Sequence, residues 1–165
     1  MELENNRLLL NQVSVGHPIP DWSLESIFDD PIPNVRDFKG SPLLILFFNL
    51  SCPGCLGRAI PYANGLIVDK NMDVKVLGIH SNFNGADFDR DEFNSAREEF
   101  YIRFPMFRDA NFDTSFLNFG AGGSPHWILV DKEGIVRYSI FGSDPDNALL
   151  RLDYMLEILK NEQIG

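Results

Sequence analysis

The run "LLILFFNLSCPGCLG", residues 43–57, decides how the chain is interpreted. Its first six residues, Leu43–Phe48, are all apolar, which is typical of a strand covered on both faces of a sheet. The only two cysteines of the 165-residue chain, Cys52 and Cys55, follow directly. Two cysteines placed at random would stand three apart in roughly one case in eighty-four, so the spacing indicates a shared task.

The place of the two cysteines favours thiol chemistry. They lie where a buried strand gives way to a helix predicted over 55–70, and reactive groups of open α/β sheets collect at this edge. Unpaired N–H groups and the helix dipole stabilise a thiolate there, and the second sulfur comes to lie beside the first. We expect Cys52 to be the exposed attacking thiolate and Cys55 the more buried resolving thiol.

The two residues between the cysteines fit a surface that binds a substrate. Pro53 suits the first helical turn, where its missing N–H costs nothing. Gly54 leaves space over which another polypeptide can lie. We expect an apolar patch around these two residues, Pro125, Phe48 and Trp127 to dock a client protein, although Phe48 and Trp127 equally suit the core.

Composition and charge limit the class of protein. The apolar share is 44%, and the formal net charge is -10, from 14 Lys and Arg against 24 Asp and Glu. This charge argues against nucleic acid or an anionic membrane as partner. No apolar window approaches the length of a membrane span, and the start of the chain lacks the apolar core of a signal peptide. We expect a cytoplasmic protein, or a periplasmic one if a leader has been removed.

The rest of the chain predicts one α/β domain over 16–165, after a polar lead-in over 1–15. The order of strand, helix and strand around the cysteines favours a parallel βαβ unit. Expected strands cover 22–24, 34–35, 43–48, 74–79, 127–130 and 135–141, with a short one in "FPMFRDANF" (104–112) and a hairpin turn at 131–134. Expected helices cover 55–70, 89–101, 114–119 and 146–160, the second of them capped by Asp89 or Asp91.

Two of these helices show an apolar face that we expect in the core. The spacing of apolar residues follows the helical period in both. The first face holds Phe93, Ala96, Phe100 and Tyr101, and the second holds Leu149, Leu152, Met155, Leu156 and Leu159.

Several segments together resemble one family. The segment "VRDFKGSPLLILFFNLSCPGC" (35–55), the opening "GHPIPDWSLESI" (16–27) and the hairpin "GGSPHWILVDKEGIVRYSIFG" (122–142) resemble TlpA/ResA-type redoxins, which are thiol–disulfide oxidoreductases. The strand "VKVLGIHS" (74–81) fits the same pattern, so the resemblance covers nearly everything after residue 15. It implies an α/β, thioredoxin-like three-layer fold, with a central mixed β-sheet flanked by helices and an N-terminal extension.

The resemblance also implies residue roles and partners. A cis proline faces the disulfide in this family, and Pro125 matches it. The preceding residue, here Ser124, offers backbone hydrogen bonds to a bound polypeptide. The redox centre is then the Cys52–Cys55 disulfide, with no prosthetic group and no metal. A disulfide-containing client protein and a dithiol electron donor are the implied partners.

Three positions depart from the family pattern. Leu46 stands where thioredoxins carry a buried acid, and Arg58 stands where ResA-like members carry a glutamate. Cys55 therefore lacks an obvious carboxylate base. Pro61 lies nine residues after Cys52, where the family proline lies eight after, and this offset predicts a bulge or a shifted kink in the helix.

Two side chains are candidates for tuning the cysteines. Arg58 can favour a thiolate by its charge, or it is a solvated helix residue. His126 follows Pro125 and can relay a proton near the sulfurs, or it is a partly exposed strand residue. We expect His17 and His80 to be structural.

Three other functions need weighing. A peroxiredoxin needs Thr and Pro at set distances before its cysteine, where this chain has Asn49 and Ile45. A structural zinc site needs a second close ligand pair, and copper delivery with His80 or His126 has no support from spacing. A redox-inactive interaction module stays open because the buried acid is missing. We predict a thiol–disulfide oxidoreductase that reduces or exchanges client disulfides through a mixed disulfide.

Overall fold

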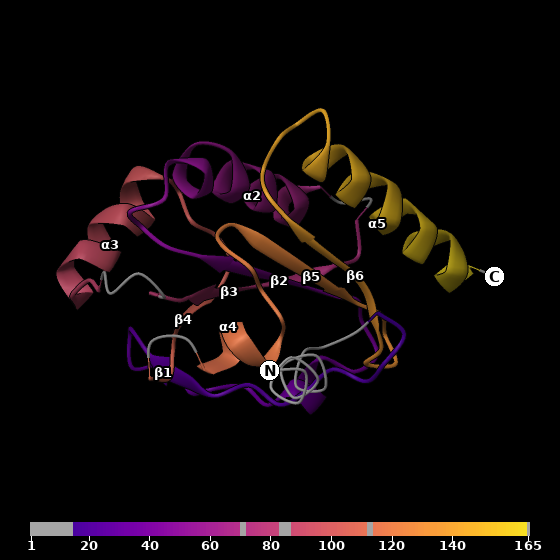
Figure 1. The fold of residues 1–165 in the computed structure, drawn as a ribbon, viewed down its shortest axis with the longest axis horizontal. Helices are drawn as coiled ribbons and strands as arrows, with labels where there is room; N and C mark the ends of the chain where they lie inside the picture. The colour runs from indigo at the N-terminus through magenta and orange to yellow at the C-terminus, as the bar shows by residue number, and fades with distance from the viewer. Residues whose placement is uncertain (1–14, 70–71, 83–86, 112–113, 165) are drawn as a thin grey trace, which may run out of the picture.

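The computed structural model describes residues 15–69, 72–82, 87–111 and 114–164, which form one mixed sheet with helices on both faces (Figure 1). The strands are Leu24–Ser26 (β1), Leu43–Phe48 (β2), Lys75–His80 (β3), Met106–Asp109 (β4), His126–Val130 (β5) and Val136–Phe141 (β6). Their order across the sheet is β1-β4-β3-β2-β5-β6. β2, β3 and β4 pair in parallel, and β1, β5 and β6 pair antiparallel to their neighbours.

The helices complete three layers, as expected. They are Val35–Phe38 (η1, a 3-10 helix), Cys55–Ala59 (η2, a π-helix), Ile60–Val68 (α2), Arg90–Glu99 (α3), Thr114–Asn118 (α4) and Ala148–Ile164 (α5). In Figure 1, α2, α3 and α5 lie on one side of the sheet, and α4 lies on the other. No helix in the described ranges combines the length and apolar character needed to cross a membrane.

Strand β2 is the centre of the core and confirms the predicted buried strand. All six of its side chains are buried, so its sequence shows no alternation of polar and apolar residues. Leu44, Leu46 and Phe48 pack under α2 and α5, whereas Leu43, Ile45 and Phe47 pack against α4. Burying one side chain of this size contributes about 2 kcal/mol to the free energy of unfolding.

The predicted helix at 89–101 is confirmed, with one correction. The Asp89 side chain accepts the Glu92 N–H, and the Glu92 side chain accepts the Asp89 N–H, so a capping box starts α3. Phe93 and Ala96 are buried as expected. The expectation for Tyr101 is wrong, because its φ of 52° turns the chain out of the helix and leaves its side chain 73% exposed.

The C-terminal helix and the hairpin follow the prediction closely. Leu149, Leu152, Leu156 and Leu159 are buried along one face of α5, and Met155 is half-buried beside them. The helix starts two residues later than predicted, at Ala148, because Asn147 belongs to the turn that Asp144 organises. The hairpin of β5 and β6 closes over a turn held by the Gly134 N–H on the Asp131 carbonyl.

The strand predicted at 34–35 is wrong. That segment starts η1, because the Asp37 carboxylate accepts the Asn34 N–H and closes a tight turn. The strand predicted at 22–24 lies two residues further on, at 24–26, where it pairs with β4. The predicted lead-in over 1–15 falls outside the described residues except for Val15, so the domain boundary stays a prediction.

Candidate active site

Cys52 occupies the cap position of the helix that follows β2. Pro53 and Gly54 are already helical, and the Leu56 N–H donates to the Cys52 carbonyl at 3.1 Å. The Cys55 N–H donates to the Cys52 Sγ at 3.3 Å, as the third amide of a helix donates to a Ser or Asp cap. A thiolate at Cys52 therefore has an N–H donor and the positive end of the helix beside it.

The two free thiols differ in exposure, as expected. Cys52 is half-buried, and Cys55 is fully buried among core side chains. Burial raises the pKa of the Cys55 thiol far above its ordinary value, and its hydrogen bond with Cys52 raises this pKa further. The Asn49 backbone and the Ser124 side chain lower it by less. Cys55 is thus a thiol in the resting protein.

The predicted cis proline is present beside the cysteines. The Ser124–Pro125 peptide bond is cis, and the Ser124 carbonyl accepts a hydrogen bond from the Cys52 Sγ at 3.4 Å. The Pro125 carbonyl accepts the Gly142 N–H at 2.8 Å, which ties the loop after β6 to the same place. Three separate segments therefore meet at the carboxyl end of β2.

Gly54 faces this meeting point. A Cβ on Gly54 would lie 3.0 Å from the Ser143 Oγ and 3.8 Å from the Pro125 Cδ. Ser143 belongs to the loop after β6 and is buried against the cysteine segment. Ser143 could not be predicted as a site residue, because only the return of the chain after β6 brings it to the site.

The loop between β2 and Cys52 is held by buried polar side chains. The Asn49 Nδ2 donates to the Ser81 carbonyl at 2.9 Å, and the Asn49 Oδ1 accepts the Ser51 N–H at 2.8 Å. The Leu50 N–H donates to the His80 Nε2 at 3.0 Å. Asn49, His80 and Ser81 were not predicted as site residues. A signal for these residues was present in the sequence. Polar residues stand at the carboxyl ends of two apolar strands, β2 and β3, which end at the same edge of the sheet.

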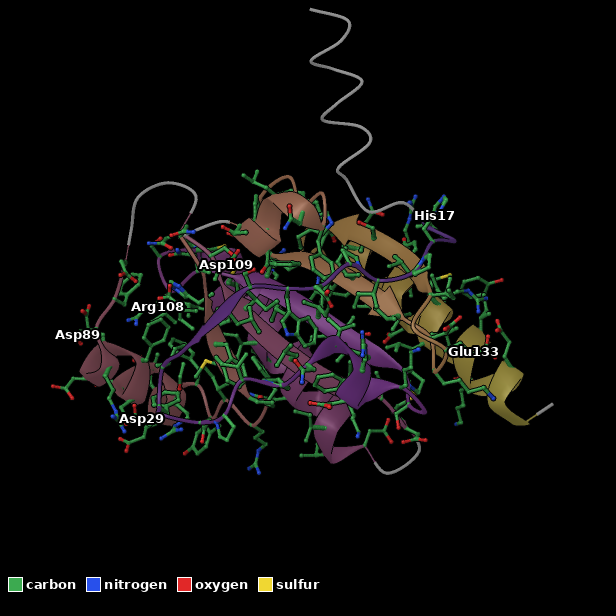
Figure 2. The ribbon with its side chains drawn as sticks, turned by 90° about the horizontal axis from the view of Figure 1, so that it is seen from below. His17, Asp29, Asp89, Arg108, Asp109 and Glu133 are labelled. Carbon is green, nitrogen blue, oxygen red and sulfur yellow. The ribbon has the colours of Figure 1, made fainter. Side chains whose placement is uncertain are left out.

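This polar cluster continues to the edge of the sheet. The Ser81 Oγ donates to the Asp109 Oδ2 at 2.8 Å, and Asp109 accepts the N–H groups of Ser115 and Phe116 at 2.7 and 2.8 Å. Figure 2 shows Asp109 beside α4. Burial raises the pKa of Asp109, and the N–H groups that it accepts counteract this. Asp109 thus connects α4 with the strand ends that carry the reactive loop.

The predicted bulge in the helix after the cysteines is confirmed. Cys55–Ala59 forms a π-helix, and α2 continues from it with Pro61 in its first turn. One turn of π-helix takes up one residue more than an α-helical turn. This extra residue explains why Pro61 lies nine rather than eight residues after Cys52.

Other predicted site residues lie apart from the sulfurs. His126 is buried, and its Nε2 forms a hydrogen bond with the Ser139 Oγ at 2.9 Å. Burial lowers the pKa of His126 to about 4. Its neighbour Trp127 packs in the same cluster as Cys55, so strand alternation turns His126 to the opposite face. Arg58 is exposed on the helix surface.

The predicted docking patch is smaller than expected. Phe48 and Trp127 are fully buried and belong to the core, because β2 and β5 have helices on both faces. Pro53 is exposed, Gly54 is half-buried, and Pro125 lies under them. The accessible part of the patch therefore consists of Pro53 and Gly54, next to the half-buried Ser124.

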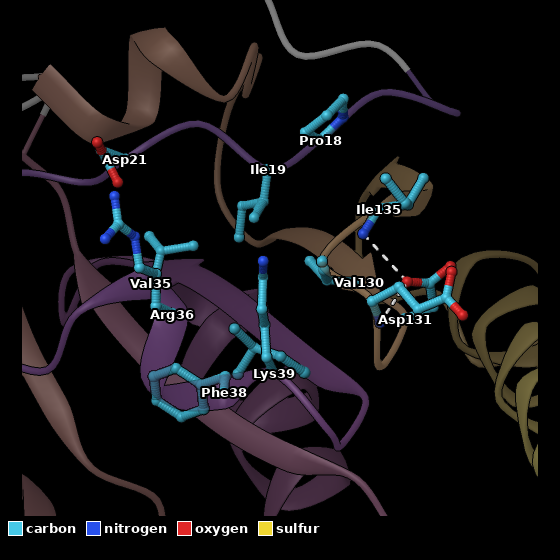
Figure 3. Close-up of a pocket in the computed structure, with 13 residues that line it drawn as sticks. Pro18, Ile19, Asp21, Val35, Arg36, Phe38, Lys39, Val130, Asp131 and Ile135 are labelled. Atoms are coloured by element: carbon cyan, nitrogen blue, oxygen red, sulfur yellow. Dashed lines mark hydrogen bonds between the residues drawn. The ribbon is translucent and has the colours of Figure 1, made fainter.

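Metal-binding groups and cavities are the other features of the molecule that can mark a functional site. Within the described ranges, no group of three or more His, Cys, Asp or Glu side chains is placed to hold a metal ion. A cavity of about 280 Å³ opens instead at the amino end of β2, between Ile19, Lys39 and the turn at Asp131 (Figure 3). The length of β2 separates this cavity from the cysteines.

Comparison with known proteins shows the family of this chain. A profile of the AhpC/TSA family matches residues 15–139. The chain is 27% identical over 132 residues to the thiol-disulfide oxidoreductase ResA of Geobacillus thermodenitrificans, covering 79% of this chain and 71% of that protein. It is 26% identical over 137 residues to the thiol:disulfide interchange protein DsbE of Vibrio cholerae, covering 81% and 68%.

Solved structures confirm the thioredoxin-like fold. A protein of the thioredoxin-like superfamily has a TM-score of 0.76 and 25% identity, over 87% of this chain and 96% of that one. A thiol-disulfide isomerase from Corynebacterium glutamicum has a TM-score of 0.68 and 26% identity, over 85% and 95%. Fold and relatives together define a thioredoxin-like dithiol–disulfide oxidoreductase, as the resemblance implied. The chain belongs to the AhpC/TSA family.

Proposed function

We propose that this chain reduces or exchanges disulfides in client proteins, with Cys52 as nucleophile and Cys55 as resolving thiol. The observation that carries the proposal is the contact between the half-buried Cys52 Sγ and the Cys55 N–H at 3.3 Å. It gives the accessible sulfur an N–H donor at a helix start, where a thiolate is stabilised.

In the first step, the Cys52 thiolate attacks one sulfur of the client disulfide. The client S–S bond breaks, a Cys52–client disulfide forms, and the other client sulfur leaves as a thiolate that takes up a proton. In the second step, Cys55 loses its proton and its thiolate attacks the Cys52 Sγ. The Cys52–client S–S bond breaks, the second client sulfur leaves as a thiolate that takes up a proton, and the Cys52–Cys55 disulfide forms. The client has then gained two electrons and is fully reduced.

The second step depends on stabilising a Cys55 thiolate, and β2 carries no acid for this purpose. Leu46, at the position of the thioredoxin acid, is fully buried among apolar side chains. The groups that favour the Cys55 thiolate are the Asn49 backbone and the Ser124 side chain. We infer that these two groups, rather than a general base on β2, support the attack of Cys55.

The client chain would lie over Pro53 and Gly54 and alongside the backbone of Ser124. A dithiol donor then returns the pair to its reduced form, and no prosthetic group enters the cycle. The direction depends on the compartment, for which the cytoplasm remains our prediction. In a reducing cytoplasm the cycle runs toward reduction of the client.

The reduction potential of the Cys52–Cys55 pair tests this function, by equilibration with glutathione or dithiothreitol buffers. We expect a reversible two-electron couple. A value near about -270 mV indicates a reductase, and one near about -120 to -180 mV indicates an oxidant or isomerase. The absence of a reversible couple would leave a redox-inactive binding module. Cys55→Ser, which cannot form the internal disulfide, is the control.

A further inference from the structure

His80 joins strand β3 to the loop that carries the nucleophile. It is the last residue of β3 and pairs in register with Phe48, the last residue of β2. Its side chain is fully buried, and its Nε2 accepts the Leu50 N–H at 3.0 Å. Leu50 stands two residues before Cys52. A side chain of one strand thus holds the reactive loop at a point where the sheet ladder has ended.

The direction of this hydrogen bond fixes the protonation state of His80. A backbone N–H only donates, so the Nε2 must present its lone pair. The imidazole is therefore neutral, with its proton on Nδ1. That Nδ1 is buried and has no hydrogen-bond partner, and the rings of Phe48, Phe88 and Phe93 surround the imidazole edge-on at centroid distances of 4.8 to 5.5 Å.

The surroundings of His80 support a neutral ring. Burial lowers the pKa of His80 to about 4. Of the charged groups that act on it, Asp87 raises this pKa and Arg108 lowers it. Arg108 lies over the Phe93 ring and donates to the Phe88 carbonyl, so it closes the aromatic enclosure around His80. A neutral acceptor suits this enclosure, because a carboxylate there would be a buried charge.

The contact at Leu50 completes the support of the loop. The Ser51 N–H donates to the Asn49 Oδ1 at 2.8 Å, and the Cys52 N–H donates to the Asn49 carbonyl at 3.0 Å. Both contacts are local to the loop. The His80 contact, like that of the Asn49 Nδ2 with the Ser81 carbonyl, ties the loop to the carboxyl end of β3, and it is the one that holds the Leu50 amide.

We propose that His80 is a positioning residue of the CPGC site, whose neutral imidazole holds the Leu50 amide and so sets the place of the Cys52 Sγ. The sulfur must meet both the Cys55 N–H and the Ser124 carbonyl, so a displaced loop weakens these contacts. This inference rests on the proposed function, since it assigns His80 to the chemistry of Cys52. It extends the structural role that the sequence predicted.

The first test is the ¹⁵N NMR spectrum of the imidazole groups in the unmodified protein. We expect one histidine, His80, to be neutral with its proton on Nδ1 at pH 7 and still so at pH 5. A proton on its Nε2, or a charged imidazole at pH 7, would overturn the inference. The measurement involves no redox reaction, so its result is separate from the success or failure of the proposed function.

The second test compares two variants by the pH dependence of Cys52 alkylation with iodoacetamide. His80→Phe keeps the ring and loses the acceptor, and His80→Gln places an amide oxygen near the position of Nε2. We expect His80→Phe to lower the alkylation rate at pH 7 about tenfold, as the loss of one hydrogen bond allows. The rate of His80→Gln should stay within about twofold of the unmodified protein.

A variant that is destabilised elsewhere separates positioning from stability. Val136→Ala removes buried volume from the opposite face of the sheet, so it lowers the melting temperature and keeps the pH dependence of alkylation. The inference would be overturned if His80→Phe and the unmodified protein had equal alkylation rates. It would also be overturned if His80→Phe and His80→Gln lowered the alkylation rate equally. If His80→Phe does not fold, the NMR result and the rate of His80→Gln decide.

Discussion

The Cys55 amide donates to the Cys52 sulfur over 3.3 Å, so the second cysteine supports the first through its backbone. The side chain of Cys55 is buried, and burial raises its pKa. In the proposed mechanism, backbone support of the Cys52 thiolate and attack on the mixed disulfide are therefore separate tasks of Cys55. A substitution of the Cys55 side chain removes the second task and leaves the first.

This separation predicts how the two cysteine variants trap a client. Cys55→Ser keeps the N–H donor to Cys52, so it should attack a disulfide-bonded protein such as insulin and stay attached to it. Cys52→Ser should form no such adduct, because its remaining thiol is buried. Non-reducing gel electrophoresis and intact mass measure the adduct. Adducts with both variants, or with neither, would contradict the assigned roles.

Gly54→Ala should slow trapping. The backbone at Gly54 is helical, with φ -66° and ψ -30°, so alanine gains up to about 1 kcal/mol in helix propensity, which the close contact of its Cβ offsets. The added Cβ would lie 3.0 Å from the Ser143 Oγ, at the surface where the client is proposed to lie. We expect trapping in the Cys55→Ser background to slow about tenfold, the effect of one misplaced methyl group.

Gly57→Ala is the matched control for this experiment. Gly57 lies one turn further along the same helix, is exposed, and has no atom within 4 Å of an added Cβ. It should gain the same helix propensity and leave the trapping rate unchanged. A similar slowing in both alanine variants would show that the helix, rather than the surface over Gly54, is responsible.

The parts of this site that could be predicted depend on local pattern. The apolar run before the cysteines specifies a buried strand, because only a strand covered on both faces needs six apolar residues in succession. The place of Cys52 at the helix start specifies its exposure relative to Cys55. The count of residues from Cys52 to Pro61 specifies an extra residue in the helix, and the structure takes it up as a π turn.

The parts that could not be predicted depend on register between distant segments. His80 reaches Leu50 only because β3 pairs with β2 so that His80 lies opposite Phe48. Ser143 reaches Gly54 only because the loop after β6 folds back. His126 was one candidate for a place near the sulfurs, but alternation along β5 turns Trp127 to that side. These registers cannot be deduced from a single sequence, since a shift of one strand by one residue exchanges the two faces of the sheet.

A hydrogen bond between Tyr62 of α2 and Asp153 of α5 is predicted to stabilise the helix layer above the cysteines. The Tyr62 hydroxyl donates to the Asp153 carboxylate, and its ring packs edge-on against Trp127 at 5.6 Å. Tyr62→Phe should lower the free energy of unfolding by about 0.5 to 1 kcal/mol, as for a partly exposed hydrogen bond. Urea unfolding measures the change.

The contribution of the Tyr62–Asp153 pair to the free energy of unfolding depends on pH in the alkaline range. Burial and the Asp153 carboxylate raise the pKa of Tyr62 above its ordinary value of about 10. The contribution of Tyr62 is therefore present below pH 10 and is lost as the pH rises further, because the unfolded chain ionises first. Tyr154→Phe, at an exposed position of α5, is the control and should match the unmodified protein. Equal behaviour of the Tyr62 and Tyr154 variants would contradict this role.

Two buried histidines should make the protein sensitive to mild acid. Burial lowers the pKa values of His80 and His126 to about 4, against about 6.5 in an unfolded chain. Between these values the unfolded chain binds more protons, so the stabilising contribution is full above pH 6.5 and falls toward pH 4. Each histidine contributes a slope of up to about 1.4 kcal/mol per pH unit in this range. Urea unfolding at pH 7, 6 and 5 measures the sum.

Replacing one of the two histidines separates their contributions. His126→Phe removes one titrating group and should roughly halve the slope between pH 6.5 and 5, whereas substitution of the exposed His17 by Asn should leave it unchanged. Asp109 acts in the opposite sense as the pH falls, because burial raises its pKa and its protonation favours the folded state. The comparison of His126→Phe with the unmodified protein cancels this contribution, since both carry Asp109. An unchanged slope in His126→Phe would show that His126 takes up protons as readily in the folded protein as in the unfolded chain.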